Sequence, residues 1–186
     1  MLDWFKQGLA KISPFPLWPE PASSTIGKPK HVEHKRYCSY VKGCRSFEDF
    51  VAEVTSKLIL RDEEGGPILG ENGKPKPDTI AQGDAFEVLS EALLNTHQLY
   101  RHLDVEPIPR SDDLGVDKTA SRPEDDLNTA IQDKFTSNPN RLHTWKGLAT
   151  FYGKSTQMRR LLITAGAGMN KKEIDLAAEE QRIRQQ

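Results

Sequence analysis

The chain has 186 residues, the usual size of one domain with room for an irregular extension. Hydrophobic residues make up 36% and charged residues 28%, which excludes a membrane-spanning composition and predicts a modest core. The formal net charge of −1 gives no sign of nucleic-acid binding, so any such function must come from local patches. Two cysteines are too few for the disulfide framework of a small secreted protein.

The N-terminal residues 1–30 are predicted to form an irregular, Pro-rich arm. Five prolines between residues 14 and 29 are incompatible with regular structure. No signal peptide or membrane span is indicated, and the sequence therefore predicts a cytoplasmic protein.

Residues 28–45 are locally basic, with six Lys and Arg residues against one Glu and with two tyrosines between them. Such a segment is expected to contact DNA phosphates, with a tyrosine stacking on a base. The alternative is a solvated, flexible charged segment. A second basic patch is expected near the edge of the sheet. The predicted DNA-binding residues are Lys35, Arg36, Lys42, Arg45, Lys154, Arg159 and Arg160.

The same segment contains residue types that bind zinc, namely His31, His34, Cys38 and Cys44. Their H-x₂-H-x₃-C-x₅-C spacing is not one of the usual zinc spacings. The alternative interpretation is exposed histidines and a buried cysteine. A zinc-dependent interaction domain is therefore the weakest of the functional hypotheses.

The first predicted helix starts after Ser46, a good N-cap, and carries apolar residues at helical spacing to Leu58. Residues 65–77 are rich in Gly and Pro and predict a loop, with a hairpin as one form. A second helix is expected over residues 84–96. We expect the folded domain to span residues 46–186, with its core at about 83–180.

The pattern after residue 96 is typical of an α/β domain whose central mixed sheet is flanked by helices. Strands are expected at residues 103–108, 115–119 and 128–135, followed by a helix at 142–152 and a buried strand at 160–165. Asn170 is expected to cap a final helix that runs to the last residue without a stop signal. The sequence is therefore interpreted as a piece of a longer protein.

Polar residues that suit catalysis gather in this half of the chain. Side chains alternate along a strand, so Gln132 and Lys134 are expected on one face and Asp133 on the other. Asp117 belongs to the preceding strand, and Glu87, on the nearby helix, adds a second carboxylate. We expect Glu87, Asp117, Gln132 and Lys134 to meet at one edge of the sheet.

This set suits the hydrolysis of a phosphodiester. Mg²⁺ prefers oxygen ligands, and one or two carboxylates with water and phosphate suffice. The metal polarises the phosphate and lowers the pKa of bound water, and a nearby lysine stabilises the negative charge of the transition state. The expected ligands of Mg²⁺ or Mn²⁺ are Glu87, Asp117 and Gln132, with Lys134 as the catalytic lysine.

The motifs G-x-x-F-E, D-x-G-V-D and Q-x-K-F, followed by a helix and R-L-L-I-T-A-G, resemble the Mrr-like branch of the PD-(D/E)xK nucleases. The resemblance covers about residues 83–180 and implies a restriction-endonuclease-like core that cuts DNA. It also implies a source in bacteria, archaea, phages or mobile elements, and a helicase domain on the C-terminal side. A homodimer is a further expectation, because a double-strand break usually takes two active sites. The sequence departs from the family pattern at Val116 and Asp133.

Each of these motifs has a simpler explanation. D-x-G-x-D strings are often turns, a Q-x-K pair is often a solvated strand face, and Glu87 has the position of a capping-box residue after Asp84. A fold can also survive the loss of its activity. The rival hypothesis is therefore a DNA-binding or targeting module that keeps the nuclease fold without cutting.

Overall fold

The computed structural model describes residues 32–96, 100, 102–108, 115–122, 124 and 126–169. The Pro-rich arm expected at residues 1–30 and the final helix expected after Asn170 lie outside these ranges. Within the described part of the chain, no helix has the length and apolar character needed to cross a membrane.

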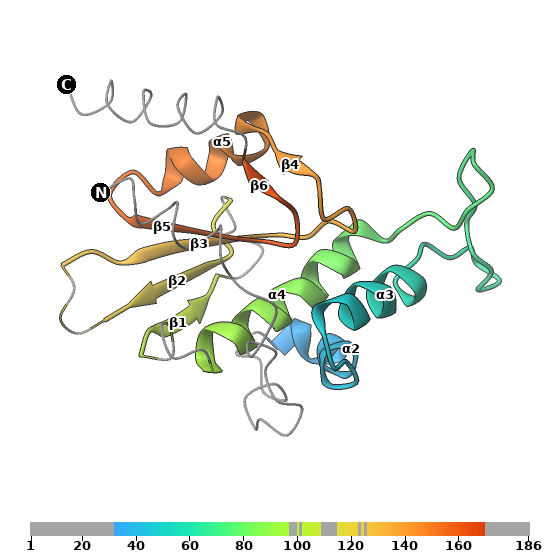
Figure 1. Ribbon diagram of the computed structural model, residues 1–186, viewed down its shortest axis with the longest axis horizontal. Helices are drawn as coiled ribbons and strands as arrows, with labels where there is room; N and C mark the ends of the chain where they lie inside the picture. Colours follow the sequence, from blue (N-terminus) through green and yellow to red (C-terminus); the bar gives the residue numbers. More distant parts are fainter. Residues whose placement is uncertain are drawn as a thin grey trace.

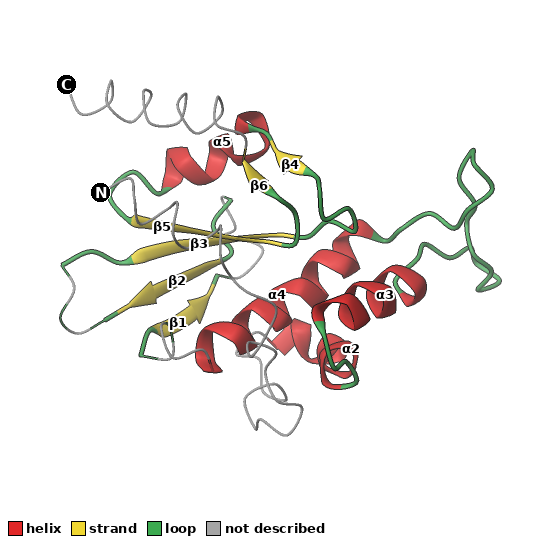
Figure 2. Cartoon of the chain, in the orientation of Figure 1, coloured by secondary structure: helices red, strands yellow, loops and turns green. Residues whose placement is uncertain are grey.

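A four-stranded mixed sheet forms the centre of the fold (Figures 1 and 2). Strands β1 (Asp104–Pro107), β2 (Lys118–Ser121) and β3 (Thr129–Lys134) are neighbours and antiparallel. Strand β5 (Arg159–Thr164) lies beside β3 and runs parallel to it. The predicted α/β layout with helices on the sheet is thus confirmed at this level.

Helix α4 (Thr79–Thr96) and helix α5 (Trp145–Lys154) cover opposite faces of the sheet (Figure 1). The two faces can be followed on β3. Ile131 is fully buried in one cluster with Leu94 of α4, whereas its neighbour Ala130 is fully buried in another with Phe151 of α5. Alternation along the strand explains why adjacent residues serve two different cores.

Helix α4 begins five residues before the expected start at residue 84. The Asp78 carboxylate accepts a hydrogen bond from the backbone N–H of Ala81 at 3.0 Å and so caps the first turn. The first turn of α4 has no regular apolar face, since Ile80 is 62% exposed and Gln82 and Gly83 interrupt the apolar residues. The helical spacing of apolar residues in the sequence therefore starts only at Ala85.

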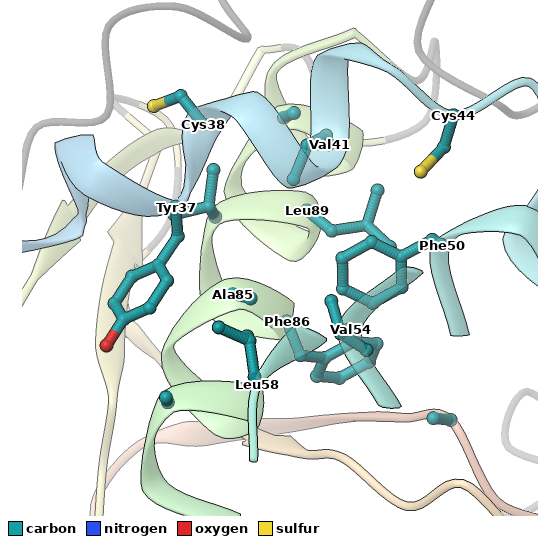
Figure 3. Packing of buried hydrophobic residues seen from close by; sticks show 14 residues of the cluster. Tyr37, Cys38, Val41, Cys44, Phe50, Val54, Leu58, Ala85, Phe86 and Leu89 are labelled. Carbon is teal, nitrogen blue, oxygen red and sulfur yellow. The ribbon is translucent and has the colours of Figure 1, made fainter. Parts of the chain in front are cut away.

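Helix α3 (Phe47–Lys57) matches its prediction, and the Ser46 hydroxyl accepts the expected capping bond from the backbone N–H of Asp49. It packs against α4 together with η1 (Val32–Tyr37) and α2 (Cys38–Lys42), as Figure 3 shows. This core includes residues on the N-terminal side of the expected boundary at residue 45. They are Tyr37, Cys38, Val41 and Cys44.

Residues 59–77 form an arm that projects beyond the helices (Figure 1). Three short extended segments, around Leu60, Ile68 and Lys76, each pair with the other two. The N–H of Leu60 donates to the carbonyl of Lys76, that of Ile68 to Leu60, and that of Lys76 to Ile68, over 2.8–2.9 Å. The expected loop therefore has hairpin-like pairing, with isolated bridges rather than continuous strands.

The helix expected at residues 142–152 starts later than predicted. Strand β4 (Leu142–His143) comes first and pairs in parallel with β6 (Gly168–Met169). Thr144 then caps α5 by accepting a hydrogen bond from the N–H of Gly147 at 3.3 Å. Because the cap is at Thr144, the two residues before it are free to extend as a strand.

Candidate active site

Strands β2 and β3 separate just before Asp117. The Cα register of the pair ends at Lys118 opposite Ile131, and the N–H of Asp117 donates to the Ile131 carbonyl at 2.9 Å. Beyond this point no described residue pairs with β3 on that side. The N–H of Asp133 donates instead to the Asp117 side chain at 2.5 Å. Asp117 therefore lies in the opening between the two strands.

Gly115 sets the direction from which the chain enters β2. Its φ of +85° is in the left-handed region that favours glycine. A Cβ at this position would also lie 3.0 Å from the backbone nitrogen of Phe151 and 3.1 Å from Thr150. The glycine thus lets the segment pass close to α5 immediately before Asp117.

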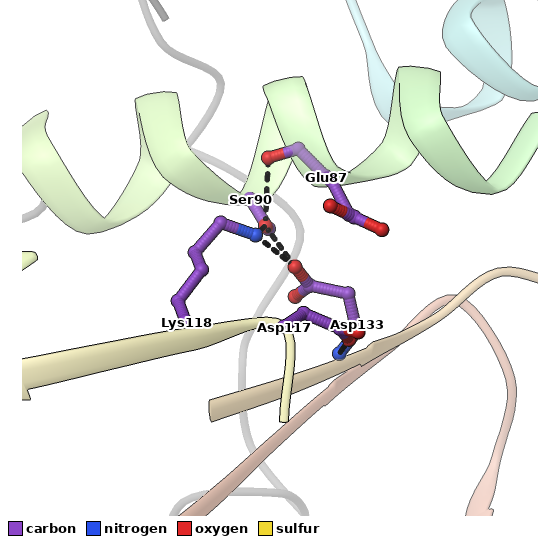
Figure 4. A network of polar contacts seen from close by, with 5 residues as sticks. All are labelled: Glu87, Ser90, Asp117, Lys118 and Asp133. Atoms are coloured by element: carbon purple, nitrogen blue, oxygen red, sulfur yellow. Dashed lines mark hydrogen bonds and ion pairs between the residues drawn. The ribbon is translucent and has the colours of Figure 1, made fainter. Parts of the chain in front are cut away.

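A buried polar network joins α4 to this end of the sheet (Figure 4). The ammonium of Lys118 forms an ion pair with Asp133 Oδ2 and donates to Ser90 Oγ at 2.9 Å. Ser90 Oγ is also 2.8 Å from Asp133 Oδ2 and 3.0 Å from the backbone carbonyl of Glu87. Because all three side chains are buried, each depends on the others for hydrogen bonds.

Lys118 stays charged in this environment. Burial by itself lowers its pKa, but the carboxylates of Asp133 and Glu87 outweigh burial and raise the pKa above its ordinary value. The Lys118 side chain is 1% exposed, so no substrate can contact it directly. Lys118 therefore acts as an internal countercharge for the acids beneath α4.

Glu87 is held mainly in its neutral form. Burial raises its pKa from the ordinary 4.5 to about 8; Lys118 opposes this, while Asp117 and Asp133 add to it. Asp117 is partly exposed, as is Glu87. A divalent cation between these two side chains would reverse the balance by favouring the ionised form of Glu87.

The structure reverses the expected orientation of β3. Asp133 points to α4, whereas Gln132 and Lys134, which were expected to face Glu87, lie on the α5 face with Ala130. Gln132 is 4% exposed, and its Oε1 accepts no hydrogen bond from any residue that the structure describes. An unsatisfied buried oxygen of this kind costs about 1–3 kcal/mol and is available to a ligand.

Lys134 is partly exposed and lies beside other basic groups. It pairs in register with Thr164 of β5, whose hydroxyl is 2.6 Å from Nε2 of His143. Burial lowers the pKa of His143, and the positive charges of Arg141 and Lys134 lower it further. The structure therefore brings Glu87 close to Asp117 on one side of the strand, and Lys134 close to His143 on the other.

The side chains around Asp117 are too few to surround a metal ion completely, but they suit one divalent cation that keeps water ligands. Among the described residues, no three His, Cys, Asp or Glu side chains are arranged to hold a metal ion. Asp117 and Glu87 provide two carboxylates, and Gln132 provides an unpaired amide oxygen on the other face. Two carboxylates with water and substrate phosphate are a common environment for Mg²⁺.

The predicted DNA-binding residues are mostly exposed, as expected of such a role. Those of the first patch are Lys35, Arg36, Lys42 and Arg45. Arg36 lies 4.0 Å from the Asp84 carboxylate, one turn before Glu87, and so places positive charge near the acids of α4.

Lys154 and Arg159 in the second patch are exposed as well. Arg160 is different. Its guanidinium donates to Ser155 Oγ at 2.8 Å and to the Tyr152 carbonyl at 3.2 Å, and lies over the Tyr152 ring. Arg160 therefore joins β5 to α5, which leaves it less free to bind DNA than Lys154.

The structure gives the proposed zinc site little support. Cys38 is the first residue of α2 and Cys44 comes two residues after its end, so their side chains lie apart, at opposite ends of this segment (Figure 3). Both are buried, Cys44 donates to the Tyr40 carbonyl at 2.8 Å, and burial raises the pKa of each thiol. His31 and the side chain of His34 lie outside the described part, so the complete set stays a prediction.

Sequence reasoning missed Ser90 and Lys118 and gave Asp133 the wrong direction. One signal for Asp133 was present, because Ile131 and Phe135 flank it at the spacing of one strand face. Both are apolar and pack toward α4. No comparable signal identifies Lys118, since a lysine in a strand is usually solvated.

Comparisons with known proteins leave the family open. No protein-family model, no curated protein and no solved structure matches this chain. The resemblance to PD-(D/E)xK nucleases therefore stays a prediction from the motifs. Any function must be argued from the geometry of this chain.

Proposed function

We propose that the protein is a metal-dependent endonuclease that hydrolyses phosphodiester bonds in DNA. The observation that carries this proposal is the position of Asp117. Its carboxylate lies where β2 and β3 separate, bonded to the backbone of β3 and close enough to Glu87 to raise the pKa of that group. Two partly exposed carboxylates at the point where the pairing of β2 and β3 ends are a suitable pair for Mg²⁺ or Mn²⁺.

Asp117 and Glu87 would hold the ion. The amide oxygen of Gln132, expected from the sequence as a third ligand, lies on the α5 face of β3 and is not part of this pair. The ion would supply Lewis-acid polarisation of the phosphate and a bound water of lowered pKa. Glu87 must release its proton to bind the ion. The backbone N–H of Asp133 holds the Asp117 carboxylate, and Lys118 supplies the buried countercharge beneath α4. The partly exposed Lys134 would act on the phosphate from the α5 face of β3.

The order of the elements supports the finer fold proposal of a restriction-endonuclease-like core. Helix α4 precedes three strands, and α5 joins β3 to its parallel neighbour β5. A helicase domain in the same protein, a homodimer and a cytoplasmic site of action belong to the same proposal, and they rest on the sequence alone.

Plasmid cleavage tests the activity. Supercoiled DNA is incubated with the full chain and Mg²⁺ or Mn²⁺, and then with Lys134→Ala. Lys146, exposed on α5, provides the matched control Lys146→Ala. We expect nicked or linear DNA from the wild type and the control, and none from Lys134→Ala. Equal cleavage by all three proteins would show that Lys134 takes no part.

One observation favours the rival function, a DNA-binding module that does not cut. Asp133 is already neutralised by Lys118, and the described residues hold no three-ligand group of acids, histidines or cysteines. Such a module would bind DNA equally well with and without metal and would leave plasmid intact at every metal concentration. Metal-dependent cleavage excludes it.

A further inference from the structure

The carboxyl ends of two parallel strand pairs meet on the α5 side of the sheet. Strands β3 and β5 end at Lys134 and Thr164, which are partners in register, and β4 ends at His143. In α/β proteins, ligands bind characteristically outside the carboxyl ends of parallel strands. Three polar side chains therefore share a position that is favourable for a ligand.

Backbone contacts hold this group together. The Thr164 hydroxyl is 2.6 Å from Nε2 of His143 and accepts a hydrogen bond from the N–H of Gly166 at 3.0 Å. The carbonyl of Arg141 accepts from the N–H of Ala167 at 2.9 Å. A Cβ at Gly166 would lie 2.5 Å from that Arg141 carbonyl, so the turn after β5 packs directly against residue 141.

The charges in this group are all of one sign. Lys134 and Arg141 both act electrostatically on His143, and no carboxylate of a described residue contributes to the pKa of His143. In the part of the chain that the structure describes, neither Lys134 nor Arg141 forms an ion pair. Neighbouring like charges repel, and an anion between them removes that cost.

We propose that Arg141, His143 and Thr164, together with Lys134, form a phosphate-binding site on the α5 face, across β3 from the acidic pair on the α4 face. The guanidinium of Arg141 offers paired N–H donors, Lys134 an ammonium, and Thr164 a hydroxyl, and these suit the several oxygens of a phosphoryl group. The phosphate is a backbone phosphate of the bound DNA, which rests on the proposed function. A free phosphate or a nucleotide shares the same chemistry.

Binding without cleavage provides the test. A fluorescent duplex is titrated in EDTA with the full chain, with Arg141→Gln, and with the matched control Lys146→Gln on α5. Arg141 is exposed, so its replacement is expected to leave the melting temperature unchanged. We expect Arg141→Gln to weaken binding about fivefold and to reduce the slope of log K against log salt by about one. The control Lys146→Gln should change the affinity by less than about twofold and leave the slope unchanged.

A second probe separates the sources of the phosphate. Inorganic phosphate and deoxyadenosine 5′-monophosphate are titrated, and their ³¹P line widths are followed with wild type and Arg141→Gln. A DNA effect, with or without line broadening by the small probes, supports a backbone-phosphate site. Broadening by the small probes alone supports the site and assigns it to a free phosphate or nucleotide. No effect on any probe overturns the proposal. Because EDTA prevents cleavage, a failure of the nuclease proposal does not alter these readings.

Discussion

The two faces of β3 carry opposite charge, which is buried and paired on one face and solvent-exposed on the other. On the α4 face, Asp133 is buried and paired with Lys118, beside Glu87. On the α5 face, Lys134 and Arg141 reach solvent and form no ion pair with any described residue. A buried charge needs a partner inside the protein, whereas water stabilises an exposed charge and leaves it able to bind a ligand. This contrast is the basis for the proposals that a cation binds beside Asp117 and Glu87 on the α4 face and that an anion binds on the α5 face.

The largest effect is expected at Asp117. Asp117→Asn removes the negative charge proposed to bind the metal but keeps an oxygen that can accept the N–H of Asp133. We expect plasmid cleavage to fall at least about a thousandfold, as for the loss of a central electrostatic group. Duplex binding and the melting temperature should stay close to those of the wild type.

The control for this prediction is Asp126→Asn, since Asp126 is exposed and distant in sequence from the acids of α4. If Asp117→Asn cuts as fast as Asp126→Asn, the metal is not held at the opening between β2 and β3, and the comparison of the two faces loses its functional meaning.

The next effect concerns stability. Lys118→Met leaves Asp133 charged and buried without its partner, and we expect the free energy of unfolding to drop by about 3–5 kcal/mol. The double variant Lys118→Met/Asp133→Asn removes both charges and should recover much of that loss. Urea unfolding of the wild type, both single variants and the double variant gives the coupling. Additive losses would mean that Lys118 and Asp133 do not act as a pair.

The sequence predicted these faces unequally. The Ser46 cap and the apolar spacing after it located α3 correctly, and the turn and strand signals predicted the pairing of β2 with β3. Alternation correctly separated Gln132 from Asp133, but a period of two does not say which set faces which helix. The fold decides that, because Ile131 must bury its side chain against α4. The burial of Lys118 depends on contacts with Ser90, 28 residues away, which no local pattern records.

An effect that depends on pH is expected at Glu87. Its pKa is raised in the fold from 4.5 to about 8, so the folded state keeps a proton that the unfolded state has lost. This contribution to stability is complete below about pH 4.5 and disappears as the pH rises to about 8. The slope between these values is on the order of 1 kcal/mol per pH unit at most. Urea unfolding in EDTA across pH 5–8 should show the decline in the wild type and a flatter profile in Glu87→Gln. A profile that Glu87→Gln leaves unchanged would exclude Glu87 as its source.

The smallest change in stability is expected on the opposite face, at Lys134. Its ammonium has no ion pair among the described residues and is partly solvated, so Lys134→Met removes repulsion with Arg141 and His143 as well as a charge. We expect its free energy of unfolding to lie within about 0.5 kcal/mol of the wild type, against the several kcal/mol at Lys118. Lys118→Met on β2 and Lys134→Met on β3 thus compare how much each lysine contributes to the free energy of unfolding. If stability is unchanged, a loss of cleavage in Lys134→Ala can be assigned to a lost contact with the phosphate and not to unfolding. A loss of stability at Lys134 as large as that at Lys118 would instead make both lysines structural and remove the contrast between the two faces.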